Sequence, residues 1–215
     1  MQLTSLKIPG YKDQPVPNTF YRHDRETTHL GIVLPGFRHS ADRAELYYGA
    51  RILLERGADV LRAEYTYYET DYVKASDAEQ YDWIVKDASA VAAAGFSQRS
   101  YEKLTLLGKS LGTIAMGHLL GERRFSNATC VWFTPILTDE ALVKRIQEIK
   151  PRSLFIIGTA DSYYKPAVLR SLVEATQGRQ LVIDGANHGL EVPGSIPQSL
   201  DILTRIVKEL QDFLT

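Results

Sequence analysis

Three polar residues with catalytic potential lie far apart in the chain. Ser110 stands between Gly108 and Gly112 in the pattern G-x-S-x-G. Asp161 follows in "GTADSYY", and His188 follows 27 residues later in "GANHGLE". A serine hydroxyl becomes a nucleophile when an imidazole takes its proton and a carboxylate orients that imidazole. These residue types predict covalent acyl transfer, provided that the fold brings the three side chains together.

The residues around Ser110 allow a second interpretation. Gly108-Lys109-Ser110 also matches the end of the phosphate-binding pattern G-x-x-x-x-G-K-[ST]. That pattern needs a glycine five residues before Gly108, where this chain has Lys103 inside a predicted strand. A nucleophile turn needs a strand before the serine, a helix after it and little bulk on either side. "KLTLLG" and "LGTIAMGHLL" provide these, so we favour the nucleophile turn over the phosphate loop.

The elements that must position these residues alternate between short apolar runs and helical patterns. Near-continuous apolar runs are typical of strands that are covered on both faces, as in parallel sheets. Two early segments, "LTSLKIP" and "VPNTFYRH", are predicted to pair antiparallel at the sheet edge. The order predicts an α/β fold with a doubly wound, mostly parallel sheet and helices on both faces. The predicted parallel strands cover residues 29–36, 58–65, 103–110, 128–135, 152–161 and 179–186.

The segments between these strands carry helix signals. Residues 76–95 open with Ser76 and Glu79, the spacing of a capping box in which each side chain satisfies the other residue's amide. Residues 43–56 show an apolar stripe, and the last helix is predicted to bury a stripe that runs from Leu200 to Phe213. Because Ser110, Asp161 and His188 each end or follow a predicted strand, we expect all three at the carboxyl edge of the sheet.

Each candidate has a structural alternative. Ser110 could serve only as the N-cap of the following helix, and Asp161 only as a turn residue. Asp139 and Asp184 also follow strands and compete for the role of the acid, although their positions favour structural roles. The other histidines are expected to pack or to face solvent: His23, His29, His39 and His118.

The motifs "GKSLG", "GTAD", "GANHGLE" and "LPGF" resemble those of the α/β-hydrolase superfamily, most closely its small members without a cap domain, which are similar to dienelactone hydrolases. The resemblance covers about residues 29 to 214, nearly the whole of a single predicted domain, 1–215. It implies that Ser110 is the nucleophile, Asp161 the acid and His188 the base, in the chain order of that superfamily. The reaction that the resemblance implies requires no metal and no organic cofactor.

The same resemblance implies an oxyanion hole. Its first donor would be the amide of Phe37, with Gly36 allowing close approach, and its second the amide of Leu111. Many members of the superfamily have His-Gly before this donor, whereas this chain has Pro35-Gly36. The departure puts the local hydrogen bonding of that loop in doubt.

Substrate contacts are expected from loops at the same edge. Tyr67 and Tyr68 follow the strand 58–65, and Tyr163 follows Asp161. Aromatic rings with a polar tip suit an acyl or aromatic group, although about half of these tyrosines could simply cover the core. Gly36 and His39 in the oxyanion loop complete the predicted contacts. Residues 136–151 have room for one helix only, which predicts an open site without a cap domain.

Composition excludes several other classes of protein. The net charge of −1 argues against nucleic-acid binding, and no apolar window approaches the length of a membrane span. The single cysteine, Cys130, is expected to be a buried thiol. The amino terminus lacks the pattern of a signal peptide, so a cytoplasmic protein that binds neither membranes nor nucleic acid is expected.

Two functions remain in competition. The favoured one is a serine hydrolase that acts on small carboxylic esters or thioesters, and the same residues would also serve a lactonase, peptidase or acyltransferase. The alternative is a non-catalytic module of the same fold that binds a small ligand or a partner protein. Neither the identity of the substrate nor the oligomeric state follows from the sequence.

Overall fold

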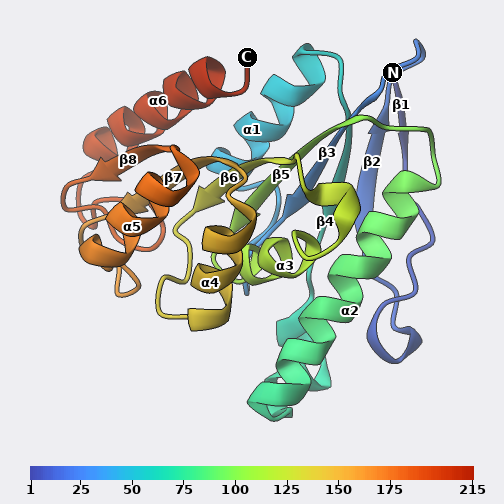
Figure 1. Cartoon of the computed structure of the whole chain (residues 1–215), viewed down its shortest axis with the longest axis horizontal. Coiled ribbons are helices and arrows are strands. Elements are labelled where there is room, and N and C mark those ends of the chain that lie inside the picture. The colour runs from blue at the N-terminus through green and yellow to red at the C-terminus, as the bar shows by residue number, and fades with distance from the viewer.

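A single sheet of eight strands forms the centre of the computed structural model, which describes residues 1–215 (Figure 1). The strand order is β1-β2-β4-β3-β5-β6-β7-β8, with β1 and β2 antiparallel at one edge and the other six strands parallel. This confirms the predicted sheet and its antiparallel edge. The strands are β1 (Gln2–Thr4), β2 (Asn18–Arg22), β3 (His29–Leu34), β4 (Asp59–Ala63), β5 (Lys103–Lys109), β6 (Thr129–Phe133), β7 (Arg152–Gly158) and β8 (Arg179–Ile183).

Six helices cover the two faces of this sheet (Figure 1). They are α1 (Ala44–Glu55), α2 (Asp77–Phe96), α3 (Leu111–Leu119), α4 (Glu140–Ile149), α5 (Pro166–Thr176) and α6 (Ile196–Phe213). Short 3-10 helices add η1 (Tyr11–Asp13), η2 (Tyr67–Glu69), η3 (Asp71–Lys74) and η4 (Arg123–Phe125). Only α4 lies between β6 and β7, so the predicted absence of a cap domain is confirmed. None of the helices combines the length and the apolar character that crossing a bilayer requires.

The alternation of side chains along β5 divides the core in two. Leu104 and Leu106 pack in the larger cluster, beneath α2 to α5. Leu107 packs in the smaller cluster, beneath α1 and α6. Because side chains alternate along a strand, Lys109 lies on the same face as Leu107, toward α1 and α6. Cys130 is buried in the larger cluster, and burial raises the pKa of its thiol, as expected for a packing residue.

The capping box predicted at the start of α2 is only half formed. The Glu79 amide donates to the Ser76 hydroxyl at 3.3 Å, as the spacing predicts. The Glu79 carboxylate does not return the bond, because it instead accepts from Lys12 Nζ at 2.8 Å and from Tyr11 Oη at 3.2 Å. A nearby cation therefore outcompetes the amide of Ser76.

The apolar stripe of α6 also differs from its prediction. Ile206 and Leu210 are buried against the sheet, as expected. Leu200, which the periodicity predicts in the same stripe, is 59% exposed. Ile202, two residues later, is buried with Ile206 and Leu210, and a two-residue step on a helix turns the side chain by about 200°. Leu200 therefore points away from the core.

Candidate active site

Ser110 occupies a strained turn between β5 and α3. Its backbone has φ 50° and ψ −116°, a conformation that L-residues rarely adopt and that is tolerated mainly where function requires it. The Ser110 amide donates to the carbonyl of Phe133 at 3.0 Å and so ties the turn to β6. The hydroxyl does not cap α3. The N-cap interpretation is therefore wrong, and the hydroxyl is left to other partners.

The two glycines of the motif make this turn possible. A Cβ at Gly112 would lie 1.9 Å from the carbonyl oxygen of Leu34, and a Cβ at Gly108 would lie 2.2 Å from Sδ of Met116. Neither position has room for a side chain, because β3 and α3 close in on both sides of the serine. The prediction that these glycines provide clearance is confirmed.

Asp161 and His188 meet although they follow different strands. His188 Nδ1 lies 2.8 Å from Asp161 Oδ2, and the other oxygen of Asp161 accepts from the Tyr163 amide at 2.9 Å. The two loops touch directly, since the Ala160 amide donates to the Ala186 carbonyl at 3.0 Å. Gly158 allows this contact, because a Cβ there would lie 2.0 Å from the same carbonyl oxygen. The predicted acid and base are thus brought together.

This pairing fixes the tautomer of the imidazole. Asp161 is buried, and its carboxylate can only accept, so Nδ1 of His188 carries the proton and donates it. Nε2 is then the ring nitrogen that can accept a proton, which is what a general base needs. The Tyr163 ring lies against the imidazole, with 5.2 Å between the ring centroids.

Lys109 connects the nucleophile strand to the loop of the base. Its side chain is 1% exposed, and Nζ donates to Oγ1 of Thr134 at 2.5 Å and to the carbonyl of His188. No carboxylate lies within ion-pair distance of this ammonium. Burial lowers the pKa of Lys109 to about 8, and the more distant charges of Glu45 and Asp161 only partly offset burial. The lysine that mimics a phosphate-binding motif is therefore internal and cannot reach a nucleotide.

The loop after β3 lies directly against the nucleophile. A Cβ at Gly36 would lie 3.1 Å from Cβ of Ser110 and 3.1 Å from the Lys109 carbonyl oxygen. The Phe37 amide donates to no backbone carbonyl, and Leu111 is the first residue of α3, where helix amides lack partners within the helix. Gly36, which precedes Phe37, thus lies beside Ser110, and the amides of Phe37 and Leu111 have no backbone partner. The Phe37 side chain packs toward Tyr72.

A second histidine–carboxylate pair lies behind this loop. His39 Nε2 lies 2.7 Å from Oε1 of Glu45, a buried residue in the first turn of α1. Burial acts to raise the pKa of Glu45, but the hydrogen bond and charge of His39 outweigh it, and the net pKa is lowered. The expectation of a solvated His39 is wrong, because the ring is held by Glu45. Sequence reasoning missed Glu45, since a charged residue in the first turn of a helix is usually exposed.

The tyrosines after β4 divide between core and surface. Tyr67 is buried and stacks between Tyr65 and Tyr72, with ring centroids 4.7 and 4.5 Å away. The predicted substrate contact of Tyr67 is therefore wrong, because this ring is almost wholly buried and packs against its neighbours. Tyr68 is exposed and lines a hollow together with His39.

The competing residues have structural partners. Asp139 caps α4 by accepting from the Leu142 amide at 2.7 Å, and Asp184 accepts from the Thr159 hydroxyl at 3.0 Å. His118 Nε2 lies 2.9 Å from the Ser89 hydroxyl on α2, which confirms its packing role. No three histidine, cysteine or carboxylate side chains are grouped as metal ligands would be.

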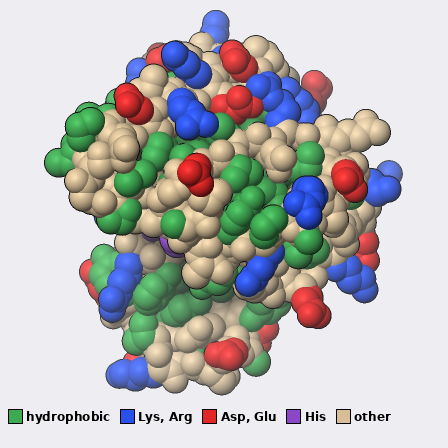
Figure 2. All heavy atoms as spheres, turned by 90° about the vertical axis from the view of Figure 1, so that its left-hand side faces the viewer, with side chains coloured by type: hydrophobic (Ala, Val, Ile, Leu, Met, Phe, Trp, Pro, Cys, Tyr) green, Lys and Arg blue, Asp and Glu red, His purple; other side chains and the backbone are tan.

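Seen from the side of α5 and α6, the surface is hollowed between an upper body and a lower lobe (Figure 2). A histidine side chain lies inside the hollow, and hydrophobic side chains gather along both of its walls. The parallel strands end toward the lower side of Figure 1, so the hollow lies at their carboxyl edge. This is the edge at which Ser110, Asp161 and His188 are held.

No protein-family model and no curated protein sequence matches this chain. Solved structures do match it over nearly its whole length. XC6422 from Xanthomonas campestris, a serine hydrolase without a lid, has 18% identity and a TM-score of 0.72, with 100% of this chain and 94% of that chain covered. The Pyrococcus furiosus esterase Pf2001 has 15% identity and a TM-score of 0.70, with 99% and 91% covered.

A Klebsiella pneumoniae protein proposed to be a dienelactone hydrolase has 13% identity and a TM-score of 0.65, with 97% and 98% covered. All three alignments extend over the eight-stranded sheet and its helices. The chain therefore has the α/β-hydrolase fold in its capless form, as the sequence motifs predict.

Proposed function

We propose that the chain is a serine hydrolase that cleaves carboxylic esters or thioesters of small molecules. The observation that carries the proposal is the strained backbone of Ser110, at the sheet edge where a buried carboxylate orients His188. Strain of this kind costs about 1–3 kcal/mol and persists where it positions a reactive group. The likeness to solved hydrolases and esterases supports the reaction class.

In the proposed reaction, the Ser110 oxygen attacks the substrate carbonyl while Nε2 of His188 takes the hydroxyl proton. Asp161 stabilises the imidazolium that forms and keeps the ring oriented. The amides of Phe37 and Leu111 donate to the oxyanion, each contributing a factor of about 10²–10³ in rate. His188 then passes the proton to the departing alcohol or thiol, which leaves an acyl group on Ser110. Water then attacks the acyl carbon and loses a proton to His188. The bond to Ser110 breaks, the serine oxygen takes that proton back, and the carboxylic acid is released.

A panel of p-nitrophenyl esters of increasing acyl length tests this proposal. We expect the wild-type protein to hydrolyse the short esters and Ser110→Ala to lose at least about 10³-fold in kcat. Ser126→Ala, which changes an exposed serine in the turn after η4, is the matched control and should retain full activity.

If well-folded wild-type protein hydrolyses none of these esters nor the matching thioesters, the proposal is wrong. The alternative of a non-catalytic binding module would then be favoured. Nothing in the geometry speaks for that module specifically, because it would have no use for a strained Ser110 or for an oriented His188.

A further inference from the structure

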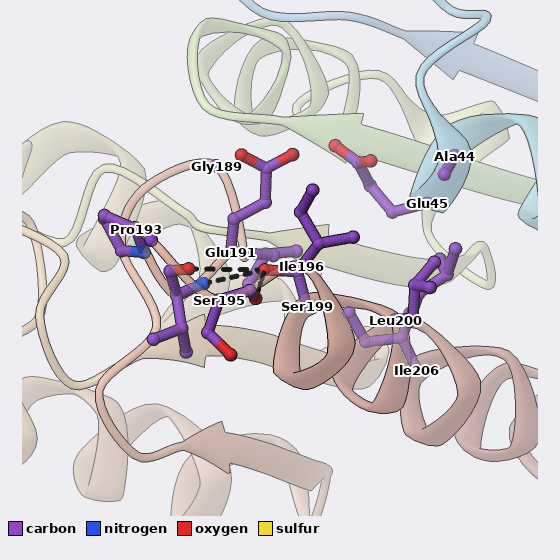
Figure 3. A pocket seen from close by; sticks show the side chains of 14 residues that line it. Ala44, Glu45, Gly189, Glu191, Pro193, Ser195, Ile196, Ser199, Leu200 and Ile206 are labelled. Carbon is purple, nitrogen blue, oxygen red and sulfur yellow. Dashed lines mark hydrogen bonds between the residues drawn. The ribbon is translucent and has the colours of Figure 1, made fainter.

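A cavity of about 530 Å³ opens next to the proposed catalytic base (Figure 3). It lies between the loop that follows His188, the first turns of α6 and the start of α1. Half of its 14 lining residues are hydrophobic, and the large aliphatic ones come from one stretch of sequence: Leu190, Val192, Ile196, Leu200, Leu203 and Ile206. A cavity of this size holds a small organic group.

Two of these aliphatic side chains are exposed to an unusual degree. Ile196 is 77% exposed and Leu200 is 59% exposed, while the residues of α6 that face the sheet are buried. Core packing therefore does not require these two positions to be apolar. Exposed apolar side chains around a cavity are typical of a binding surface, and contact with an apolar ligand would remove them from water.

The wall of the cavity is already formed without a ligand. The Ser199 hydroxyl donates to the Ser195 carbonyl at 2.9 Å and accepts from the Val192 amide at 3.1 Å. These bonds tie the loop to the first turns of α6 (Figure 3). Gly194 has φ 82°, which allows the loop to turn back toward the helix. A preformed wall lowers the entropic cost of binding.

Two independent links join the cavity to the proposed chemistry. Gly189 lines the cavity and directly follows His188. On the opposite wall, Glu45 holds His39, whose loop packs through Gly36 against Ser110. In acyl transfer the imidazole delivers its proton to the leaving group, so the leaving group must lie beside the imidazole. Both links place the cavity next to segments that hold the proposed base and the proposed nucleophile.

The charges around the cavity restrict what it can hold. Glu45 and Glu191 are its only ionisable lining residues, and no lysine or arginine lines it. The carboxylates of Glu45 and Glu191 both point toward the same side of the cavity (Figure 3). Glu191 forms no ion pair, and Lys109, whose charge interacts with it, is buried and does not line the cavity. An anionic group would be repelled here, whereas a neutral or cationic one would be accepted.

We propose that this cavity is a subsite for the leaving group, and that it takes an aliphatic alcohol or thiol portion that carries no negative charge. The proposal rests on the proposed hydrolase function and adds a substrate class to it. Esters of neutral aliphatic alcohols are then preferred over esters whose alcohol portion bears a carboxylate or phosphate.

Acetate esters of alcohols with two to eight carbons test the length preference, with release of acid followed at constant pH. Each methylene that enters the cavity should raise kcat/KM by up to about 4-fold. We expect this dependence to flatten in Leu200→Asp and in Ile196→Asp. Leu3→Asp, which changes a side chain of β1 that is 64% exposed, is the matched control and should keep the wild-type profile.

The charge preference has its own test. Glu191→Lys should raise kcat/KM for an acetate ester of a hydroxy acid at least about 5-fold relative to an uncharged ester of equal length. A profile that depends on acyl length and not on alcohol length would overturn the assignment to the leaving group. Conversion of a dimer to a monomer by Leu200→Asp, with an unchanged alcohol profile, would mean that the surface is an interface between copies and that the subsite proposal is wrong.

A binding measurement separates this proposal from the proposed function. In Ser110→Ala, 1-octanol should shift the amide resonances of residues 189–200, and Leu200→Asp should abolish the shifts. Octanol binding by a protein that hydrolyses no ester would refute the hydrolase and leave the cavity as an alcohol site. Ester hydrolysis with neither octanol binding nor a dependence on alcohol length would refute the subsite alone.

Discussion

Two histidine–carboxylate pairs lie on either side of the proposed nucleophile, and they are built differently. In the first, Asp161 engages Nδ1 of His188, whose side chain is 37% exposed. In the second, Glu45 engages Nε2 of His39, whose side chain is 16% exposed. Both N–O distances are close to 2.8 Å. A short hydrogen bond between a histidine and a carboxylate therefore does not by itself distinguish a catalytic base from a structural histidine.

The nitrogen that remains available distinguishes the two pairs. His188 keeps Nε2, the far end of its ring, free, and its side chain is partly exposed, so it can exchange protons with a substrate. His39 uses that same nitrogen to hold α1 and is largely enclosed. We infer that the His188 pair acts in proton transfer, whereas the His39 pair fixes the loop of Gly36 and Phe37. The following changes test this division, from the largest expected effect to the smallest.

Asp161→Asn should have the largest effect. The asparagine amide would donate to Nδ1 and so favour the wrong tautomer of His188, which should lower kcat by about 10⁴-fold. Steady-state hydrolysis of a p-nitrophenyl ester measures this loss. Glu45→Gln is the matched change in the other pair, and an equal loss there would contradict the division of roles.

Lys109→Met tests whether the loop of the base depends on the buried ammonium. Met has a similar length but cannot donate to the His188 carbonyl or to Thr134, so the loop should lose its anchor. We expect kcat to fall by about 10- to 100-fold with little change in KM. Lys109→Arg, which keeps a donor, should recover part of the activity. Unchanged kcat in Lys109→Met would show that the anchor is dispensable.

Glu45→Gln should have a smaller effect on catalysis. Glutamine can still bond to His39 but lacks the charge, so the oxyanion loop should loosen without losing its position. We expect a loss in kcat of roughly 3- to 10-fold, since the donors remain present but less well placed. Measurement of kcat for Glu45→Gln and for His39→Ala should give similar losses. A loss in either variant as large as that of His188→Ala would contradict a purely positioning role.

The pH dependence of stability should report the burial of Lys109 directly. Its pKa is about 8 in the folded chain and near 10.5 when unfolded, so the unfolded chain binds more protons between these values. The free energy of unfolding of the wild type, relative to Lys109→Met, should therefore rise from pH 8 to pH 10.5, by roughly 3 kcal/mol at most. Urea titrations at several pH values measure it, and a constant difference would contradict a buried ammonium.

The parts of the site that follow from backbone rules could be predicted from the sequence. Gly108 and Gly112 indicate the nucleophile turn because only glycine clears β3 and α3 there. Asp161 and His188 could be placed together because both follow parallel strands, whose carboxyl ends share one edge of the sheet. These inferences need only the order of the strands and the types of the residues that follow them, and both can be read from short stretches of the sequence.

Features that depend on packing between distant segments could not be predicted. Tyr67 and Tyr68 are adjacent in the sequence, yet one is stacked in the core and the other is exposed. His39 looks like a loop residue until the fold brings α1 and Glu45 behind it. Leu200 belongs to the predicted stripe, but the side of α6 that meets the core is the one that carries Ile202 and Ile206. In each case the outcome is decided by packing against residues that lie far away in the chain.

Labelling with a fluorophosphonate tests the central claim most directly, because the reagent reacts with a serine only when a base activates it. Intact mass and peptide mapping should place a single adduct on Ser110 in the wild type. His188→Ala should slow the labelling at least about 10³-fold, and His39→Ala should slow it about 10-fold or less. An adduct on another residue, or equal labelling rates in the wild type and His188→Ala, would contradict the account.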